Sequence, residues 1–312
     1  MFLKVLIIGG AGYFGAVTVR YLLSLGHEVT VIDDFRYNGD SLLDLCSNKR
    51  FDVIRSDIRD TRAVKSAILR NEVIVPFSAV VGKTLCDKYV YECYSINSEI
   101  TEEIIRFVSD DQWLIYPSTQ SCYGHTEAMQ LCTENSELNP VSHYAKSKCI
   151  AERSVMQKNR SYICRFATLY GVSPRMRTDL LINNLVAQAV YNGYTLLNNA
   201  SSYRNYLHVY DGARAIGHII ANLGDLETGV YNIGNQALNC TVEDICHRIS
   251  DIIPGFRYVV DNSIECYDTR NYQVSIEKFY ATDWRPSITL EDGINELVKA
   301  YTMLQIHRYV NY

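Results

Sequence analysis

A tyrosine and a lysine four residues apart carry the chemistry that this sequence offers. Tyr144 and Lys148 lie in a stretch of helical character that begins near Pro140, so both side chains project from one helix face, about one turn apart. A phenol titrates at about 10 and is a weak base at neutral pH, but a neighbouring ammonium favours the phenolate. The pair therefore predicts a tyrosine that removes a proton from a hydroxyl group.

A cluster of hydroxyl side chains precedes this pair. The cluster runs from Ser118 to Tyr123 and follows the apolar stretch 113–116, which is typical of a buried strand. The carboxyl ends of parallel strands form the edge of a sheet at which ligands bind. We therefore expect this cluster, which includes Thr119 and Ser121, to lie at the edge of the ligand crevice.

A glycine turn near the N-terminus is the element that must hold a cofactor beside this tyrosine. The apolar run 4–8 is followed by Gly9, Gly12 and Gly15 and by a helical pattern, which is typical of a buried strand that turns sharply into a helix. Gly9 permits the turn, Gly12 lets the backbone approach a pyrophosphate, and Gly15 lets the helix pack on the strand. The helix dipole then faces the phosphates, so the sequence predicts a dinucleotide site.

An aspartate after the second strand favours NAD. Asp33 follows the apolar stretch 29–32, about 20 residues beyond the turn, where a carboxylate accepts hydrogen bonds from a ribose diol. Asp33 would repel a 2′-phosphate. Arg36 could pair with such a phosphate, which leaves NADP as the second possibility.

Strands alternate with helical patterns through the first half of the chain. Further strands are expected at 51–55 and 73–77, and helical periodicity runs from Asn97 to Val108. This order predicts an α/β fold with a doubly wound, Rossmann-like parallel sheet. Asp57 and Ile58 would hold an adenine ring or cap a strand end, and the small residues after Phe77 suit a turn that passes under the cofactor.

The strand and helix pattern weakens beyond Gly171. We expect residues 1–170, together with elements from about 205–235, to form the dinucleotide-binding domain. Residues 171–312 are expected to form a smaller, mixed substrate lobe that is interleaved with it.

Composition excludes several classes of protein. A net charge of -5 and scattered basic residues give no footprint for nucleic acid. No leader-like segment and no apolar run long enough for a membrane span is visible, so we expect a cytoplasmic protein. The ten cysteines include no Cys-x-x-Cys spacing and are read as reduced, and the seven histidines show no metal-binding pattern, so no metal is expected.

Taken together, these motifs resemble the extended short-chain dehydrogenase/reductase family, and within it the nucleotide-sugar epimerases and dehydratases. The resemblance covers essentially the whole chain, including the three glycines, Asp33, Asn97, the hydroxyl cluster, Tyr144 with Lys148, and the segments 165–171, 204–209, 284–286 and 290–293. It implies a tightly held NAD that takes a hydride from a sugar carbon, usually C4, while Tyr144 removes the hydroxyl proton. It also implies that Thr119 hydrogen-bonds the same sugar oxygen, that Lys148 binds the nicotinamide ribose, and that the protein is a homodimer through the helices around Asn97 and Tyr144.

The expected cofactor contacts come from the turns that follow the strands and from the catalytic helix. They are Gly9, Gly12, Tyr13, Phe14, Gly15, Asp33, Asp57, Ile58, Phe77, Ser78, Ala79, Asn97, Tyr144 and Lys148.

Arginines are the candidates for the diphosphate of a nucleotide sugar, because a guanidinium matches a phosphate bidentately. Arg204 matches a position of the family, whereas Arg175, Arg177 and Arg270 are candidates that a solvated surface position would explain equally well. Asn184 matches a family position that contacts the sugar nucleotide.

The residues beside Thr119 separate the reactions that share a first hydride step. In the 4,6-dehydratases of the family an aspartate and a glutamate follow this threonine, whereas Gln120 and Ser121 stand here and neither titrates usefully, which disfavours dehydration. The segments 74–82, 167–181, 290–294 and 305–311 look most like a subgroup that includes the GDP-heptose C4 dehydrogenases of bacterial capsule synthesis. Thr168 replaces an asparagine found in many epimerases. These features favour C4 oxidation, with a 4-epimerase as the alternative.

Overall fold

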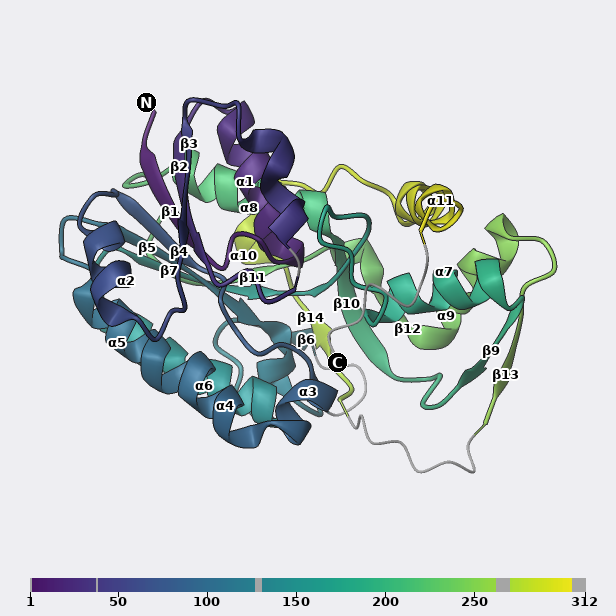
Figure 1. The fold of residues 1–312 in the computed structure, drawn as a ribbon. Coiled ribbons are helices and arrows are strands. Elements are labelled where there is room, and N and C mark those ends of the chain that lie inside the picture. The colour runs from purple at the N-terminus through teal and green to yellow at the C-terminus, as the bar shows by residue number, and fades with distance from the viewer. Residues whose placement is uncertain (1, 38, 127–130, 262–269, 305–312) are drawn as a thin grey trace.

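A seven-stranded parallel sheet forms the centre of the larger lobe (Figure 1). The computed structural model describes residues 2–37, 39–126, 131–261 and 270–304, so the segment 305–311 that resembles the GDP-heptose subgroup lies outside the described residues. The strand order is β11-β7-β5-β4-β1-β2-β3. The strands are β1 (Lys4–Ile8), β2 (Glu28–Asp33), β3 (Phe51–Arg55), β4 (Val73–Pro76), β5 (Trp113–Thr119), β7 (Ser161–Phe166) and β11 (Gly229–Ile233).

The order of the strands reverses between β1 and β4, which places a ligand crevice at their carboxyl ends. Every pair in this sheet is parallel. These features confirm the predicted α/β fold with a doubly wound parallel sheet.

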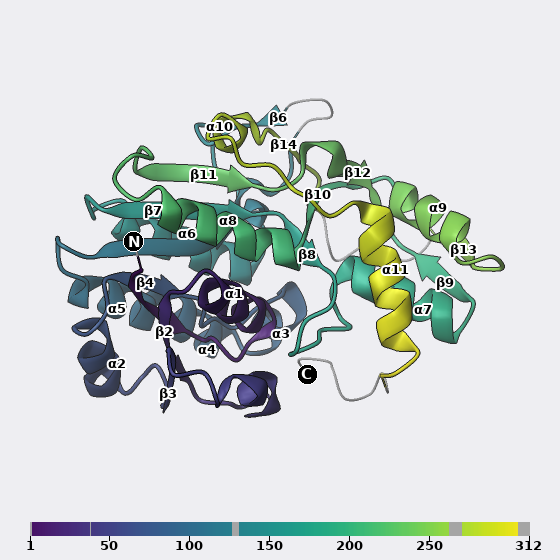
Figure 2. The same cartoon turned by 90° about the horizontal axis from the view of Figure 1, so that it is seen from above.

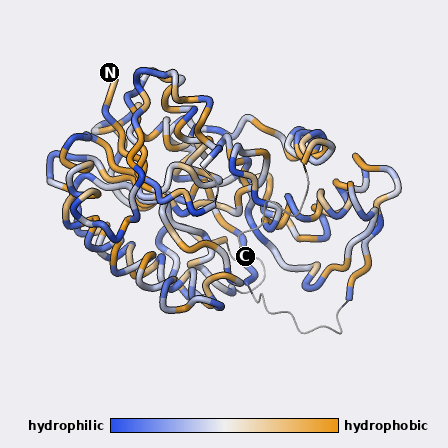
Figure 3. Tube along the Cα trace, in the orientation of Figure 1, coloured by the Kyte–Doolittle hydropathy of each residue, from blue (hydrophilic) through white to orange (hydrophobic). Residues whose placement is uncertain are grey.

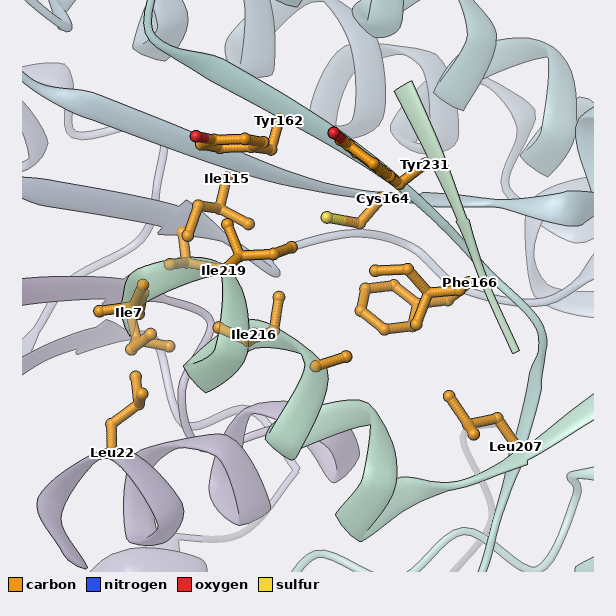
Figure 4. Packing of buried hydrophobic residues seen from close by; sticks show 14 of the residues in the cluster. Ile7, Leu22, Ile115, Tyr162, Cys164, Phe166, Leu207, Ile216, Ile219 and Tyr231 are labelled. Carbon is orange, nitrogen blue, oxygen red and sulfur yellow. The ribbon is translucent and has the colours of Figure 1, made fainter. Parts of the chain in front are cut away.

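Helices cover both faces of the sheet, because successive residues of β1 are apolar and point to opposite sides. On one face, Ile7 packs with Leu22 of α1 (Tyr13–Ser24) and with Ile216 and Ile219 of α8 (Val209–Ala221), as Figure 4 shows. Phe279 of α10 (Glu277–Tyr280) joins the same cluster. The opposite face is covered by α2 (Thr61–Ile68), α3 (Lys83–Lys88), α4 (Val90–Tyr94), α5 (Thr101–Phe107) and α6 (His143–Val155). Hydrophobic residues accordingly follow the strands of the sheet (Figure 3).

Helical structure in the segment before β5 begins earlier than the sequence pattern predicted. The expected helix starts at Asn97, but α3 already begins at Lys83, and a π-helical turn η2 (Ser95–Ile100) joins α4 to α5. Cys86 and Cys93 are completely buried in the cluster beneath the sheet. Tertiary burial of these small side chains stabilises short helices that periodicity alone does not reveal.

The smaller lobe lies beside the carboxyl ends of the strands (Figure 2). It contains a three-stranded mixed sheet of β8 (Thr168–Tyr170), β10 (Tyr203–His208) and β12 (Asn239–Thr241), and a pair formed by β9 (Tyr194–Leu197) and β13 (Arg257–Val260). Its core joins α7 (Leu181–Tyr191), α9 (Val242–Ile252) and α11 (Leu290–Tyr301).

Shorter elements complete the structure. A two-stranded pair is formed by β6 (Leu131–Cys132) and β14 (Gln273–Val274), and 3₁₀ turns are formed by η1 (Gly39–Leu45), η3 (Gln120–Tyr123) and η4 (Gln236–Leu238). Within the described ranges, no helix is both long and apolar enough to cross a bilayer.

Candidate active site

A cavity of about 960 Å³ opens where the carboxyl ends of the central strands meet the smaller lobe. Its walls come from the turns after β1, β2, β3 and β4, from the end of β5, from α6, and from the segment between β8 and α7. All of the predicted site residues except Asn97 and Arg204 line this cavity. One space of this size thus brings the glycine turn and the tyrosine–lysine pair together.

The glycine turn has the shape that a dinucleotide requires. Gly9 has φ +87°, and a Cβ there would lie 2.6 Å from the backbone nitrogen of Ser78, so only glycine fits. A Cβ on Gly15 would lie 2.5 Å from the carbonyl oxygen of Gly9. Gly12 differs, because its Cβ would meet only that carbonyl oxygen, at 3.4 Å. Gly12 begins α1 without any side-chain cap, so the open cradle and the helix N-terminus fit a pyrophosphate.

Asp33 is fixed at the end of β2. Its Oδ2 accepts a hydrogen bond from the Ala11 backbone N–H at 2.9 Å, and its Oδ1 accepts one from the Phe35 N–H at 2.8 Å. Burial raises the pKa of Asp33, and these two hydrogen bonds lower it. The carboxylate is held beside the glycine turn, which fits a ribose diol.

Asp57 has the strand-end role that the sequence analysis left open, and its contact with an adenine ring stays a prediction. Its carboxylate accepts a hydrogen bond from the Arg59 N–H at 2.9 Å and pairs with the Arg59 guanidinium, which lowers the pKa of Asp57. The residue therefore stabilises the turn after β3, and it also lines the cavity next to Ile58.

Asn97 lies behind the cavity wall. Asn97 does not line the cavity in which we predicted it to contact the cofactor, because it is buried and its Oδ1 accepts from the Val80 N–H at 2.7 Å. Its Nδ2 donates to the Val80 carbonyl at 2.9 Å and to Ser147 Oγ at 3.1 Å. Asn97 thus ties the segment that contains Ser78 and Ala79 to α6, and it shapes the wall from outside.

Thr119, Tyr144 and Lys148 line one part of the cavity. Thr119 ends β5, and its Oγ1 accepts a hydrogen bond from the Ser121 N–H at 3.1 Å, which leaves its own proton for donation. Lys148 is 4% exposed, and its Nζ lies 4.0 Å from the centre of the Tyr116 ring. Ser142 caps α6, which carries Tyr144 and Lys148, by accepting from the Ala145 N–H.

Burial acts on both groups of the tyrosine–lysine pair. It raises the pKa of Tyr144 well above its ordinary value, and the cations that oppose this are Arg177 and Arg270. It lowers the pKa of Lys148 from 10.5 to about 8, so the ammonium is still charged at neutral pH. The structure therefore places Arg177 and Arg270, and not Lys148, among the main charges that lower the pKa of Tyr144.

Replacing the buried ammonium should stabilise the protein and slow the reaction. The Lys148→Met variant is expected to raise the free energy of unfolding at pH 7 by up to about 3 kcal/mol, because the folded state no longer keeps a desolvated charge. The unfolded parent binds a proton between pH 8 and 10.5 that the folded parent does not, so parent stability rises through that range and the advantage of the variant disappears. Urea unfolding at several pH values measures this difference.

Lys146→Met is the matched control for this prediction. Lys146 lies on the same helix and is exposed, so its replacement should change neither stability nor its pH dependence appreciably. A constant difference between Lys148→Met and the parent across pH 7 to 10.5 would contradict the buried charge.

The arginines after β8 are buried, so the alternative of a solvated surface position is wrong for them. Arg175 and Arg177 are 6% and 7% exposed. Arg177 binds both carboxylate oxygens of Asp179. The Arg175 guanidinium lies over the Tyr37 ring, 4.8 Å from its centre. Arg175 thus faces the loop after β2, whereas Arg177 acts electrostatically on Tyr144.

The other two arginines lie closer to the mixed sheet of the smaller lobe. Arg270 donates to Ser121 Oγ at 2.7 Å, so two predicted substrate residues meet in the cavity. Arg204 is 5% exposed and donates to the Tyr203 carbonyl at 2.7 Å and to the Arg270 carbonyl. Because Arg204 does not line the cavity, it supports the backbone of Arg270 in this structure. Asn184 lines the cavity from the first turn of α7 and is exposed.

Several cavity residues escaped the sequence analysis, among them Lys83, Thr84 and Asp179. Gly82, Lys83 and Thr84 line the cavity at the start of α3, where Gly82 has φ +96°. Gly82 is the N-cap residue of α3, and glycine is among the residues favoured at that position. Asp179 was missed because its pairing with Arg177 follows from loop conformation.

Comparisons with known proteins agree with this geometry. The NAD dependent epimerase/dehydratase family matches residues 5–234. The low-salt glycan biosynthesis protein Agl12 of Haloferax volcanii is 27% identical over 314 residues, which cover 96% of this chain and 98% of that protein. The dTDP-glucose 4,6-dehydratase 1 of Escherichia coli is 25% identical, with 96% and 92% covered. The crystal structure of dTDP-glucose 4,6-dehydratase from Bacillus anthracis in complex with NAD is 23% identical and has a TM-score of 0.82, with 98% of each chain covered.

Proposed function

The chain belongs to the NAD dependent epimerase/dehydratase family, and from this premise we propose that it oxidises a nucleoside-diphosphate-linked sugar at C4 to the 4-keto sugar. Family membership confirms the predicted cofactor, NAD. The observation that carries the proposal is the arrangement of Tyr144 and Thr119 in the same cavity as the glycine turn and Asp33.

The side chains around the sugar have separate tasks. When bound, NAD supplies the acceptor for the hydride that leaves C4. Tyr144 accepts the proton of the C4 hydroxyl, and the Thr119 hydroxyl donates to the same sugar oxygen. Arg177 and Arg270 favour the phenolate of Tyr144. Lys148 lines the same cavity, with its Nζ 4.0 Å from the centre of the Tyr116 ring, and its proposed task is to bind the nicotinamide ribose.

The surroundings of Thr119 support oxidation over dehydration. Gln120 is completely buried, does not line the cavity, and donates to the Ile233 carbonyl at 3.4 Å. Ser121 lines the cavity and accepts from Arg270. In the described part of the chain, the carboxylates that line the cavity are Asp33, Asp34, Asp57, Asp87 and Asp179. None of them follows Thr119, so no acid stands where the dehydratases expel water.

We propose a GDP-heptose as the substrate, on the resemblance of the segments 74–82 and 167–181 to that subgroup. Arg270 supports a diphosphate, since its guanidinium lies at the cavity wall beside Ser121. We also propose a cytoplasmic homodimer. Tyr91 of α4 is 85% exposed, next to the helices expected to form the interface.

A panel of nucleotide sugars tests this function. The purified protein is incubated with GDP-heptose, UDP-glucose and dTDP-glucose, and the products are identified by NMR while the absorbance of reduced nicotinamide is followed. We expect net reduction of nicotinamide and a 4-keto heptose from GDP-heptose alone. A sugar inverted at C4 without net reduction would establish the 4-epimerase instead, and a 4-keto-6-deoxy sugar would contradict the argument from Gln120.

A further inference from the structure

Arg36 connects the loop after β2 to helix α4 at the rim of the cavity. Its Nε donates to Asp34 Oδ2 at 2.7 Å, and its Nη1 donates to Glu92 Oε1 at 3.0 Å. Asp34 also accepts a hydrogen bond from the Arg36 backbone N–H at 3.1 Å. Arg36 and Asp34 line the cavity, whereas Glu92 comes from a helix that packs on α6.

This rim is the place where a second phosphate on the adenosine ribose would have to bind. Asp33 ends β2, and in dinucleotide-binding folds a carboxylate at this position reads the ribose 2′-hydroxyl, while a nearby arginine accommodates a 2′-phosphate. Arg36 is three residues beyond Asp33 and is the cation that such a phosphate would need. Whether the Arg36 guanidinium can pair with this phosphate therefore decides whether NADP can bind.

The charges around Arg36 oppose a phosphate. Arg59 pairs with Asp57, and Arg36 pairs with Asp34 and Glu92. With Asp33, these pairs comprise four carboxylates and two guanidinium groups. A 2′-phosphate brings a further charge of about -1.5 to -2 into this excess of negative charge.

We propose that Glu92 determines cofactor specificity: together with Asp34 it holds the Arg36 guanidinium in carboxylate pairs, so that the protein binds NAD in preference to NADP. The inference rests on the proposed assignment of a dinucleotide to this cavity. It assigns a function to a residue of α4 that lies 56 positions from Arg36 and does not line the cavity.

The test compares the binding of the two cofactors to the full chain after bound nucleotide has been removed. Calorimetric dissociation constants for NAD and NADP are measured for the parent and for Glu92→Gln, a substitution that keeps the size of the side chain and removes its charge. We expect Glu92→Gln to tighten NADP binding about two- to fivefold and to change NAD binding by a smaller factor. This gain should shrink at high salt, because the rim is exposed and its charges are screened.

Two further variants test whether Arg36 is responsible for the tighter NADP binding of Glu92→Gln. Adding Arg36→Gln to Glu92→Gln should abolish the gain, because the released guanidinium is then missing. Glu28 is exposed and lies at the other end of β2 from Asp33, so Glu28→Gln should leave the preference for NAD over NADP unchanged. The role of Glu92 would be overturned if Glu92→Gln bound NADP no more tightly than the parent does, or if the double variant bound NADP as tightly as Glu92→Gln. In both cases the variants would still bind NAD. Failure of the parent to bind NAD would overturn the dinucleotide assignment itself.

Discussion

The Tyr144→Phe variant is expected to oxidise the sugar about 10²- to 10⁴-fold more slowly than the parent while it still binds NAD. The substitution removes only the phenolic oxygen. The ring remains packed against the cluster beneath the sheet, and the glycine turn and Asp33 are untouched. Thr119 can still donate to the sugar oxygen, but no side chain accepts the proton.

The pH dependence of the parent should identify the same group. Burial raises the pKa of Tyr144, so the parent rate should increase with pH as more phenolate forms, until the ammonium of Lys148 is lost above its pKa of about 8. The residual rate of Tyr144→Phe should lack the rising limb. Single-turnover measurements of reduced nicotinamide between pH 6 and 8 provide the comparison.

Tyr206→Phe is the control for this variant. The Tyr206 hydroxyl is buried away from the cavity and has no hydrogen-bond partner among the described residues, so its removal should leave the rate and the NAD content unchanged. A Tyr144→Phe enzyme within about twofold of the parent rate would exclude the phenol as the base.

The Arg165→Met variant should lose about 3–5 kcal/mol of unfolding free energy relative to the parent. Arg165 of β7 and Glu152 of α6 form an ion pair of 2.8 Å, and their side chains are 2% and 1% exposed. The Ser118 hydroxyl also donates to this carboxylate, immediately before Thr119. Removing the guanidinium would leave a buried carboxylate without its cation.

The same ion pair sets the spacing of the catalytic residues. Glu152 lies one turn beyond Lys148 on α6, and Ser118 and Arg165 lie on paired strands. The pair therefore holds α6 against the end of β5, which should make the loss of activity in Arg165→Met exceed what the unfolded fraction explains. Urea unfolding midpoints and rates at saturating substrate separate these two effects.

Two controls accompany this prediction. Arg248→Met breaks an ion pair of 2.6 Å whose side chains are about half exposed, and it should cost less than about 1 kcal/mol. The double variant Arg165→Met/Glu152→Met should recover most of the lost stability, because neither charge is then buried. A double variant less stable than Arg165→Met would contradict this explanation.

The sequence by itself determined the parts of the site that lie within single elements. The apolar run before Gly9 and the positions of Gly12 and Gly15 are sufficient to predict β1, the turn and the start of α1, since backbone geometry at Gly9 and close packing at Gly15 forbid other residues there. The four-residue spacing of Tyr144 and Lys148 is sufficient to place both on one face of α6. Such local relations follow from the periods of helices and strands.

Only the tertiary structure decided which long polar side chains meet. Arg177 binds Asp179 and Arg270 binds Ser121, whereas Arg204, the one arginine of the three that matched a family position in sequence, lies outside the cavity. The tertiary structure also decided that Asn97 binds Val80 behind the cavity wall and that Arg36 pairs with Glu92. A long side chain pairs with whichever partner the packed elements bring within reach, and spacing along the chain carries no information about distances across the fold.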